Sequence, residues 1–494
     1  MRTFRWRIAV LSLLSVACPL VAGCGSGDAA AQARPSRPAS RRGTHPNIVL
    51  VSIESLREDH VGCYGYAKPT TPFLDRLAGE GVRFHNVVSP TSWTLPAHAS
   101  LFTGLNSYTH GLVANAFRLG DGVVTLAEVL KSAGYRTAGL YGGPYLHPTY
   151  GIAQGFETYV SCMTKISDDL SGDAVRAEAS VAASSAHDDV TGPRTLERVT
   201  RWLDTIGDRP FFLFVHLWDP HYDYIPPERC WRIFDPDYSG TLTGEGMMTN
   251  KAINAGMSKR DLEHLIALYD GEIRFTDENL SKILAEIARR RPVDSSLVVV
   301  TADHGEEFFE HGEKGHQKTL YEEVIRVPLV VRWPGHIDAG RVVQDQVRLI
   351  DVMPTVLSLA GVPAPTRIEG RDVSPLLRGK ALEAAPALCD LQNRPPQLYA
   401  VRTNSHMFIA AQVGHGSQVK FGYQFYDLER DPGERTPLPQ GSSGSPEAYG
   451  TLNALCRQSG AVRALLGQTV VPHIVTDQKL LQKLKSLGYI GGGK

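Results

Sequence analysis

Acidic and imidazole side chains stand soon after several apolar runs of this sequence. The side chains in these positions are Glu54, His216, Asp219, His221, Asp303 and His304. Carboxylates and imidazoles are the groups that most often bind divalent metals and transfer protons in active sites. Their repeated position after apolar runs indicates one gathered polar site rather than scattered surface charge.

The apolar runs themselves have the pattern of buried strands. Near-continuous β-forming residues occur at 47–53, 211–215, 297–300 and 327–331, and residues 272–287 carry apolar side chains at helical spacing. Continuous rather than alternating hydrophobicity is typical of strands that are buried on both faces of a parallel sheet. We therefore predict a doubly wound α/β sheet, in which ligands bind beyond the carboxyl ends of the strands.

The composition is that of an ordinary globular protein without a marked charge. The 494 residues include 51 Lys and Arg against 52 Asp and Glu, which gives a net charge of −1. Nucleic-acid-binding proteins usually carry a clear basic excess, so we expect no nucleic acid partner. The length fits two or three domains of about 150 residues each, or one large enzyme core with an appendage.

The N-terminus has the layout of an export signal. Basic residues precede an uncharged run from Ile8 to Gly23, which is shorter than the roughly 20 apolar residues of a membrane span. The run ends at Cys24 in a sequence that resembles the lipobox of bacterial lipoproteins. We predict a signal peptide over residues 1–23 and a lipid on Cys24. An ordinary signal peptide and an uncleaved anchor are the alternatives.

A flexible tether is predicted over residues 24–45, which are rich in Ala, Gly, Ser, Pro and Arg. Position 25 is Gly rather than the Asp that retains lipoproteins at the inner membrane. We therefore expect a lipid anchor in the cell envelope, on the periplasmic side of the outer membrane or at the cell surface. No later segment is apolar enough to span a bilayer.

Several motifs follow one another in a fixed order along the chain. They occupy residues 46–60, 62–65, 94–104, 219–221, 301–307, 320–328 and 487–489. Together they resemble the sulfatase family, within the alkaline phosphatase superfamily, from about residue 46 to about residue 377. The resemblance implies a catalytic domain over residues 46–375, with a doubly wound, mostly parallel sheet flanked by helices. It also implies a smaller α+β subdomain over residues 376–494.

The nucleophile position departs from the sulfatase pattern. Sulfatases carry Cys or Ser in a C/S-x-P-x-R motif, and that residue is oxidised to formylglycine. Here the motif reads Thr94, Pro96 and His98, and threonine cannot become formylglycine. Glu54 also replaces the usual Asp. These features resemble the Thr-nucleophile branch of the superfamily, which includes phosphoethanolamine transferases and phosphodiesterases, and His316 has a spacing similar to that of an extra His in those transferases.

The resemblance implies a divalent metal held by Glu54, Thr94, Asp303 and His304. This mixed oxygen and nitrogen set favours Zn²⁺ or Mn²⁺, with Ca²⁺ as the alternative because it prefers oxygen ligands. The predicted catalytic side chains are Thr94 as nucleophile, and His98, His221 and His316. These histidines would hold oxygens of the substrate, bind a second metal or protonate the leaving group.

Thr94 is also predicted to cap a helix that Gly104 ends. Capping alone is the alternative to a nucleophile at Thr94, and an ordinary loop histidine is the alternative at His316. We interpret His216, Asp219 and His311 as structural or supporting residues. The acidic loop of Glu306, Glu307, Glu310 and Glu313 is predicted to be a solvated face.

Three functions remain open on the sequence. The first is a hydrolase of phosphate, phosphonate or sulfate esters, acting on a small molecule or on a glycan or lipid. The second is a phosphoethanolamine-type phosphotransferase that acts on an envelope glycan or lipid, although those transferases have membrane helices that this chain lacks. The third is a catalytically inactive, sulfatase-like binding protein.

Overall fold

The computed structural model describes residues 45–163, 190–291, 296–413 and 420–472. The predicted signal peptide, the lipidation site Cys24, nearly all of the tether and the motif at 487–489 lie outside these residues. No helix within the described ranges is long and apolar enough to cross a membrane.

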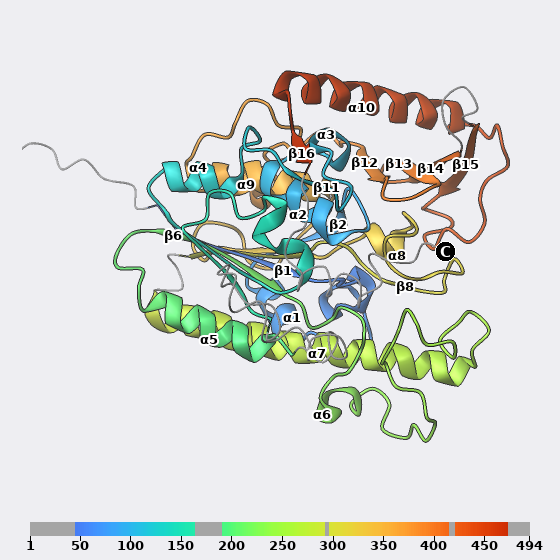
Figure 1. The fold of residues 1–494 in the computed structure, drawn as a ribbon, viewed down its shortest axis with the longest axis horizontal. Helices are drawn as coiled ribbons and strands as arrows, with labels where there is room; N and C mark the ends of the chain where they lie inside the picture. The colour runs from blue at the N-terminus through green and yellow to red at the C-terminus, as the bar shows by residue number, and fades with distance from the viewer. Residues whose placement is uncertain (1–44, 164–189, 292–295, 414–419, 473–494) are drawn as a thin grey trace, which may run out of the picture. The chain divides into compact units, whose positions relative to one another are not determined.

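An eight-stranded sheet forms the centre of the larger layered region (Figure 1). Its order is β11 (Arg341–Arg348), β2 (Val82–Val88), β10 (Leu329–Arg332), β7 (Ser296–Ala302), β1 (Asn47–Ile53), β6 (Phe211–Leu217), β4 (Arg136–Tyr141) and β5 (Thr158–Ser161). Every residue of β1, β6 and β7 is buried, as expected for central strands covered on both faces. The prediction of a mostly parallel α/β sheet is confirmed.

Strand β10 differs from the expected parallel direction, because it runs antiparallel to both β7 and β2. A parallel pair needs a long crossover, usually through a helix. The chain between β7 and β10 contains only the two-residue strands β8 (Glu307–Phe308) and β9 (Lys314–Gly315) and the four-residue helix α8 (Glu322–Ile325). The chain therefore turns back at the edge where β7 ends, and β10 runs in the opposite direction beside it.

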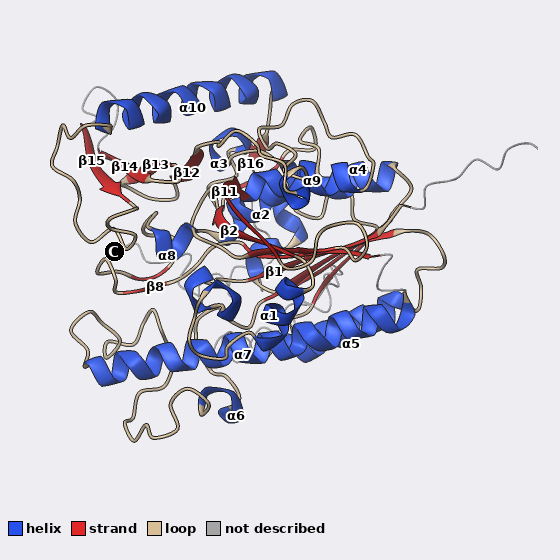
Figure 2. Cartoon of the chain, turned by 180° about the vertical axis from the view of Figure 1, so that it is seen from behind, coloured by secondary structure: helices blue, strands red, loops and turns tan. Residues whose placement is uncertain are grey.

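Helices cover both faces of this sheet (Figures 1 and 2). On one face lie α1 (Pro72–Gly79), α5 (Gly192–Leu203) and α7 (Lys259–Arg290); on the other lie α2 (Thr94–Thr103), α4 (Leu126–Ser132) and α9 (Val352–Leu359). Helix α7 is longer than the predicted 272–287. It begins after Ser258, whose hydroxyl accepts a hydrogen bond from the Asp261 N–H.

A second, antiparallel sheet follows, in the order β12 (Ala387–Leu391), β13 (Gln397–Arg402), β14 (His406–Val413) and β15 (Lys420–Asp427). Helix α10 (Ser445–Leu466) packs on it through Leu452, which joins a small apolar cluster with Phe408 and Phe425. The expected α+β subdomain is thus present. The predicted boundary at residues 375 and 376 falls between the two sheets and stays a prediction.

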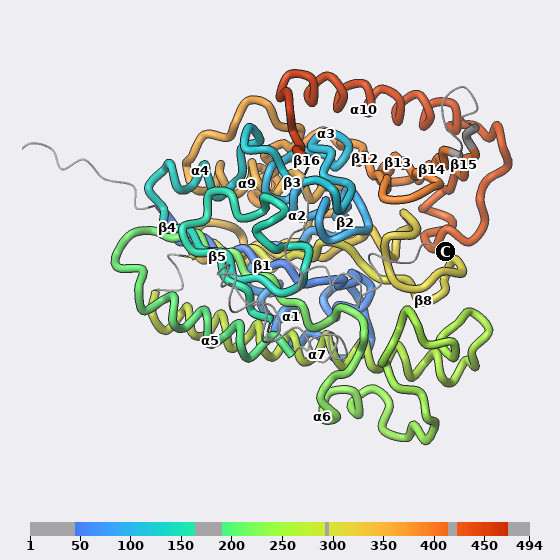
Figure 3. Tube along the Cα trace, viewed as in Figure 1, coloured from blue at the N-terminus to red at the C-terminus, as the bar shows by residue number. Residues whose placement is uncertain are grey.

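The chain after α10 comes back to the first part of the fold. Strand β16 (Val470–Pro472) pairs with β3 (Phe117–Leu119), and α10 also contacts the short helix α3 (Ser107–His110), as the trace in Figure 3 shows. The remaining short helix, α6 (Glu228–Trp231), packs on α7.

Candidate active site

Three neighbouring strands bring their polar side chains to one edge of the large sheet. Strand β1 pairs with β6 on one side and β7 on the other, with Ser52 opposite His216 and Ile53 opposite Ala302. Glu54 therefore leaves β1 beside His216 of β6 and beside the two residues that follow β7. Those residues are Asp303 and His304, and all four polar side chains are fully buried.

Thr94 approaches this edge from the first turn of α2. Its hydroxyl donates a hydrogen bond of 3.0 Å to Glu54 Oε1 and lies 3.3 Å from His304 Nε2. The predicted N-cap role is wrong by one residue, because Trp93 is the N-cap and Thr94 is the first helical residue. The hydroxyl that would cap the helix is instead directed at Glu54. The helix ends at Gly104 as predicted, with a φ of 66°.

The charged groups at this edge shift one another's protonation. Burial opposes the charge on Glu54, but its close ion pairs with His216 and His304, at 3.0 and 3.2 Å, hold its pKa well below the ordinary value. Burial together with the charge of Glu54 raises the pKa of Asp303 to about 7. The pKa of His304 rises to about 9, because the carboxylates of Asp303 and Glu54 outweigh the effect of burial.

The side chains present fit a divalent cation. Glu54 Oε2 and Asp303 Oδ2 are buried and have no hydrogen-bond partner within the described residues. His216 Nε2 lies 3.0 Å from Glu54 Oε2 as an ion pair but also lacks hydrogen-bond geometry. Asp303 Oδ2 likewise lies at ion-pair distances, 3.4 Å from His304 Nε2 and 3.7 Å from His98 Nδ1. Two carboxylates buried this close together carry a large desolvation cost, which a bound cation would lower.

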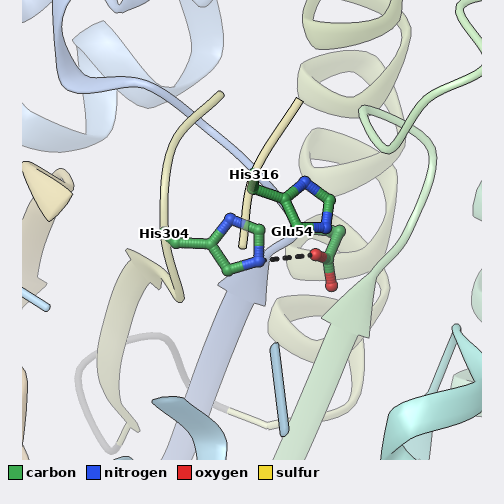
Figure 4. Close-up of side chains that lie close together, drawn as sticks. All are labelled: Glu54, His304 and His316. Carbon is green, nitrogen blue, oxygen red and sulfur yellow. Dashed lines mark ion pairs between the residues drawn. The ribbon is translucent and has the colours of Figure 1, made fainter. Parts of the chain in front are cut away.

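His316 faces the same carboxylate. Candidate ligand atoms of Glu54, His304 and His316 lie within 4.8 Å of one another, and Figure 4 shows both imidazoles directed towards Glu54. The rings of His304 and His316 are 4.4 Å apart between centroids. Burial lowers the pKa of His316. The structure therefore places this predicted residue at the site.

Glu306 orients His316 through the ring nitrogen Nδ1. His316 Nδ1 donates to Glu306 Oε1 at 3.0 Å, and the hydroxyl of Tyr224 donates to Glu306 Oε2 at 3.0 Å. The prediction of a solvated acidic loop is wrong here, because Glu306 and Glu307 are fully buried. Sequence reasoning missed this role, and only the position of Glu306 two residues after His304 marked it.

His221 lies next to His316. Its ring stacks on Trp218 with centroids 3.9 Å apart, and it is 5.2 Å from the His316 ring. His221 thus reaches the site through its contact with His316.

His98 supports Thr94 from within the fold. Its Nδ1 donates to the Thr94 carbonyl at 2.8 Å, and its Nε2 lies 3.0 Å from Ser52 Oγ. Burial lowers the pKa of His98 to about 3, so the ring is neutral. His98, His216 and Asp303 also form a second group of candidate metal ligands, and the second-metal role of His98 stays a prediction.

The three residues that we interpreted as structural or supporting, His216, Asp219 and His311, each contact a different part of the fold. His216 donates its Nδ1 hydrogen to the Gly142 carbonyl at 2.9 Å, which directs its Nε2 at Glu54. Asp219 accepts a hydrogen bond of 2.7 Å from the Thr191 N–H at the start of α5. His311 contacts Glu323 at 2.6 Å, and the two form a third group of candidate metal ligands with Glu307, separate from the groups that contain Glu54 and Asp303.

Comparison with known proteins gives a consistent family. Residues 46–362 match the family model described as Sulfatase, and residues 310–443 match the one described as N-sulphoglucosamine sulphohydrolase, C-terminal. Arylsulfatase A of Homo sapiens is 27% identical over 476 residues, which cover 83% of this chain and 87% of that protein.

Two solved structures share the fold. The phosphonate monoester hydrolase of Agrobacterium radiobacter is 22% identical, with a TM-score of 0.68 over 87% of this chain and all of that one (100%). A protein in complex with its substrate D-glucosamine-2-N,6-O-disulfate is also 22% identical, with a TM-score of 0.67 over 85% of this chain and 98% of that one. At these identities the likeness concerns the fold alone.

Proposed function

The chain belongs to the sulfatase family, and we propose that it is a metal-dependent hydrolase of sulfate, phosphate or phosphonate esters with Thr94 as its nucleophile. The observation that carries this proposal is the contact of the Thr94 hydroxyl with Glu54 and His304, at 3.0 and 3.3 Å. Threonine cannot be oxidised to formylglycine, so the proposed chemistry is independent of that modification.

Glu54, Thr94, Asp303 and His304 would hold the cation, with Zn²⁺ or Mn²⁺ favoured over Ca²⁺ by the mixed donor set. When bound, a divalent cation would favour the deprotonated hydroxyl and stabilise charge on the ester group. Glu54 orients the Thr94 hydroxyl through its hydrogen bond. The position of Thr94 in the first turn of α2 adds the positive end of the helix to the place where an anionic substrate would bind.

The reaction would proceed in two steps. Thr94 Oγ1 passes its proton to Glu54 Oε1, to which it is hydrogen-bonded, and forms a bond to phosphorus or sulfur. The bond from that atom to the ester oxygen breaks, and His316 in its imidazolium form, paired with the Glu306 carboxylate, gives a proton to the departing alcohol. Water then attacks the threonine ester and gives one proton to His316, while Glu54 returns the proton that it took to Thr94 Oγ1 as the acid is released. The Glu306 carboxylate fixes the orientation of His316 for proton transfer.

A turnover panel tests this proposal. The protein starting at Gly25 is dialysed against Zn²⁺, Mn²⁺ or Ca²⁺ and offered nitrophenyl sulfate, phosphate, phosphodiester and phosphonate, with Thr94→Ala as the control. Metal-dependent cleavage that Thr94→Ala loses supports the proposal. Equal turnover by Thr94→Ala would reject it, and a protein that neither turns over these esters nor binds a divalent ion would favour the inactive binding protein.

The lipid anchor at Cys24 is part of the proposal and would hold the enzyme in the cell envelope, facing the periplasm or the exterior. Such a position also suits a phosphoethanolamine-type transferase that acts on an envelope glycan or lipid. The two reactions differ in the second step, where an alcohol rather than water would accept the group from Thr94. Release of the donor alcohol that depends on an added acceptor alcohol would identify the transferase.

A further inference from the structure

Ser55, the residue directly after Glu54, contacts both carboxylates of the proposed metal site. It is fully buried and has two hydrogen-bond donors, its backbone N–H and its hydroxyl. The N–H donates to Asp303 Oδ1 at 3.1 Å, and the hydroxyl donates to Glu54 Oε1 at 3.3 Å. A single residue therefore binds one oxygen atom of each carboxylate.

The carboxylate oxygens that Ser55 does not bind are the ones left without a hydrogen bond. Glu54 Oε2 and Asp303 Oδ2 are buried and have no hydrogen-bond partner within the described residues. Glu54 Oε1 also accepts from the Thr94 hydroxyl, and Asp303 Oδ1 also accepts from the His304 N–H at 3.0 Å. The protein donors thus gather on one oxygen of each carboxylate, which leaves the other oxygen for a cation.

The backbone of Ser55 is strained in the conformation in which it makes both contacts. Its φ is 52°, in the left-handed region that glycine adopts freely and other residues rarely enter. The hydroxyl of Tyr269, on α7, holds this turn, because it donates to the Ser55 carbonyl at 2.6 Å and accepts from the Arg57 N–H at 3.0 Å. A glycine would remove the strain but would have no hydroxyl for Glu54. Strain that the surrounding contacts maintain in this way is typical of functional positions.

We propose that Ser55 is a positioning residue of the metal centre, which turns Glu54 Oε2 and Asp303 Oδ2 towards the cation and keeps Glu54 Oε1 for the Thr94 proton. Hydrogen-bond donors that orient ligating carboxylates in this way strengthen metal binding, and their loss typically weakens it by about ten- to a hundredfold. The role rests on the proposed function, because it concerns the cation of that site. It adds a residue that orients the ligands and supplies none itself.

Zn²⁺ titration of the apo protein and urea unfolding of the same protein test this role together. Ser55→Gly removes the hydroxyl and the strain, whereas Ser55→Thr keeps the hydroxyl and adds a β-branched side chain at the positive φ. We expect Ser55→Gly to bind Zn²⁺ about tenfold more weakly than the parent, and Ser55→Thr to stay within about threefold of it. The urea midpoints of the apo proteins should have the reverse order, with Ser55→Gly above Ser55→Thr.

Ser55→Ala separates the hydroxyl from the strain, because it removes the hydroxyl and keeps a side chain at the positive φ. It should lose as much Zn²⁺ affinity as Ser55→Gly. Ser89→Ala is the matched control, since Ser89 is also fully buried but its hydroxyl donates to the Thr91 carbonyl at 2.9 Å. The Zn²⁺ affinity of Ser89→Ala should stay within about twofold of the parent, because this hydroxyl has no contact with the carboxylates.

The outcomes separate this role from the proposed function. Weaker Zn²⁺ binding in Ser55→Gly and Ser55→Ala, with no ester turnover in the parent, would keep the positioning role and reject the hydrolase. Parent-like Zn²⁺ affinity in both variants would overturn the role, and Ser55 would then only close the turn after β1. A loss in Ser55→Thr as large as in Ser55→Gly would also overturn it, because the affinity would not follow the hydroxyl. A parent that binds no Zn²⁺ would overturn both the role and the metal site.

Discussion

The hydroxyl of Thr94 donates a hydrogen bond of 3.0 Å to Glu54 Oε1, although 40 positions separate the two residues in the chain. Glu54 follows the central strand β1, and Thr94 opens α2 on one face of the sheet. The contact joins the proposed nucleophile to a proposed metal ligand in a fully buried setting.

Thr94→Val should abolish turnover, with a loss on the order of a thousandfold or more, because valine keeps the shape of threonine but has no hydroxyl. Thr94→Ser keeps the hydroxyl and should keep part of the activity. The measurement is kcat on the preferred nitrophenyl ester. A Thr94→Val protein that is folded by circular dichroism and active would be incompatible with the nucleophile role.

Removal of the metal should lower thermal stability, because a ligand that binds only the folded state adds to its free energy of unfolding. At a free metal concentration of a hundred times Kd, this gain is about 2.7 kcal/mol. The thermal midpoint is compared before and after chelation and after Zn²⁺ or Mn²⁺ is restored. Glu54→Gln should remove the difference, and an identical midpoint with and without metal in the parent would speak against the site.

His216→Ala should weaken metal binding by about ten- to a hundredfold, because its Nε2 contacts Glu54 Oε2 at 3.0 Å and orients that carboxylate. His264→Ala is the matched control, since His264 is a buried histidine that contacts Asp235 rather than Glu54 and belongs to none of the candidate ligand groups among the described residues. Isothermal titration of the apo protein with Zn²⁺ measures both variants. Equal Zn²⁺ affinities for the two variants would show that His216 does not support the metal site.

His316→Ala should reduce turnover by about a hundred- to ten-thousandfold on alkyl esters, whose alcohols need a proton to leave. The loss should be much smaller on nitrophenyl esters, whose leaving group is stable as an anion. Glu306→Gln should show the same dependence on the leaving group in weaker form, and Glu307→Gln should not. An equal loss on both kinds of ester would reject the proton-donor role of His316.

Arg402→Met should destabilise the fold by about 3–5 kcal/mol, because it leaves buried partners of the guanidinium without their cation. Arg402 is almost fully buried and bonds to Glu322 at 2.7 and 2.8 Å and to Asn86 at 2.7 Å. Arg430→Met, which removes an exposed charge, should cost less than about 0.5 kcal/mol. Urea unfolding measures both, and a similar cost for the two variants would contradict the structural role of Arg402.

The sequence predicted the central strands well because burial on both faces leaves a continuous apolar run, as in β1 and β7. A continuous apolar run does not indicate the direction of a strand, so the sequence predicted a parallel β10 although this strand is antiparallel. The first turns of α7 were missed although Leu262, Leu265 and Tyr269 recur there at helical spacing, and Leu265 and Tyr269 are buried.

Among the site residues, too, some could be placed from the sequence and others could not. Glu54, Asp303 and His304 could be placed together because each follows a central strand, and the family resemblance added Thr94 and His316. Glu306 could not be placed, since four acids within eight residues have the composition of a solvated loop. Its burial depends on Tyr224 and His316, which approach from other segments.

The most direct test of the account is the mass of the peptide that carries Thr94 after rapid acid quenching during turnover of a nitrophenyl ester. We predict that this peptide gains one phosphoryl or sulfuryl group, that fragmentation assigns the group to Thr94, and that Ser92→Ala leaves the adduct in place. Turnover with no adduct on Thr94, or with the group on Ser92, would contradict the threonine nucleophile.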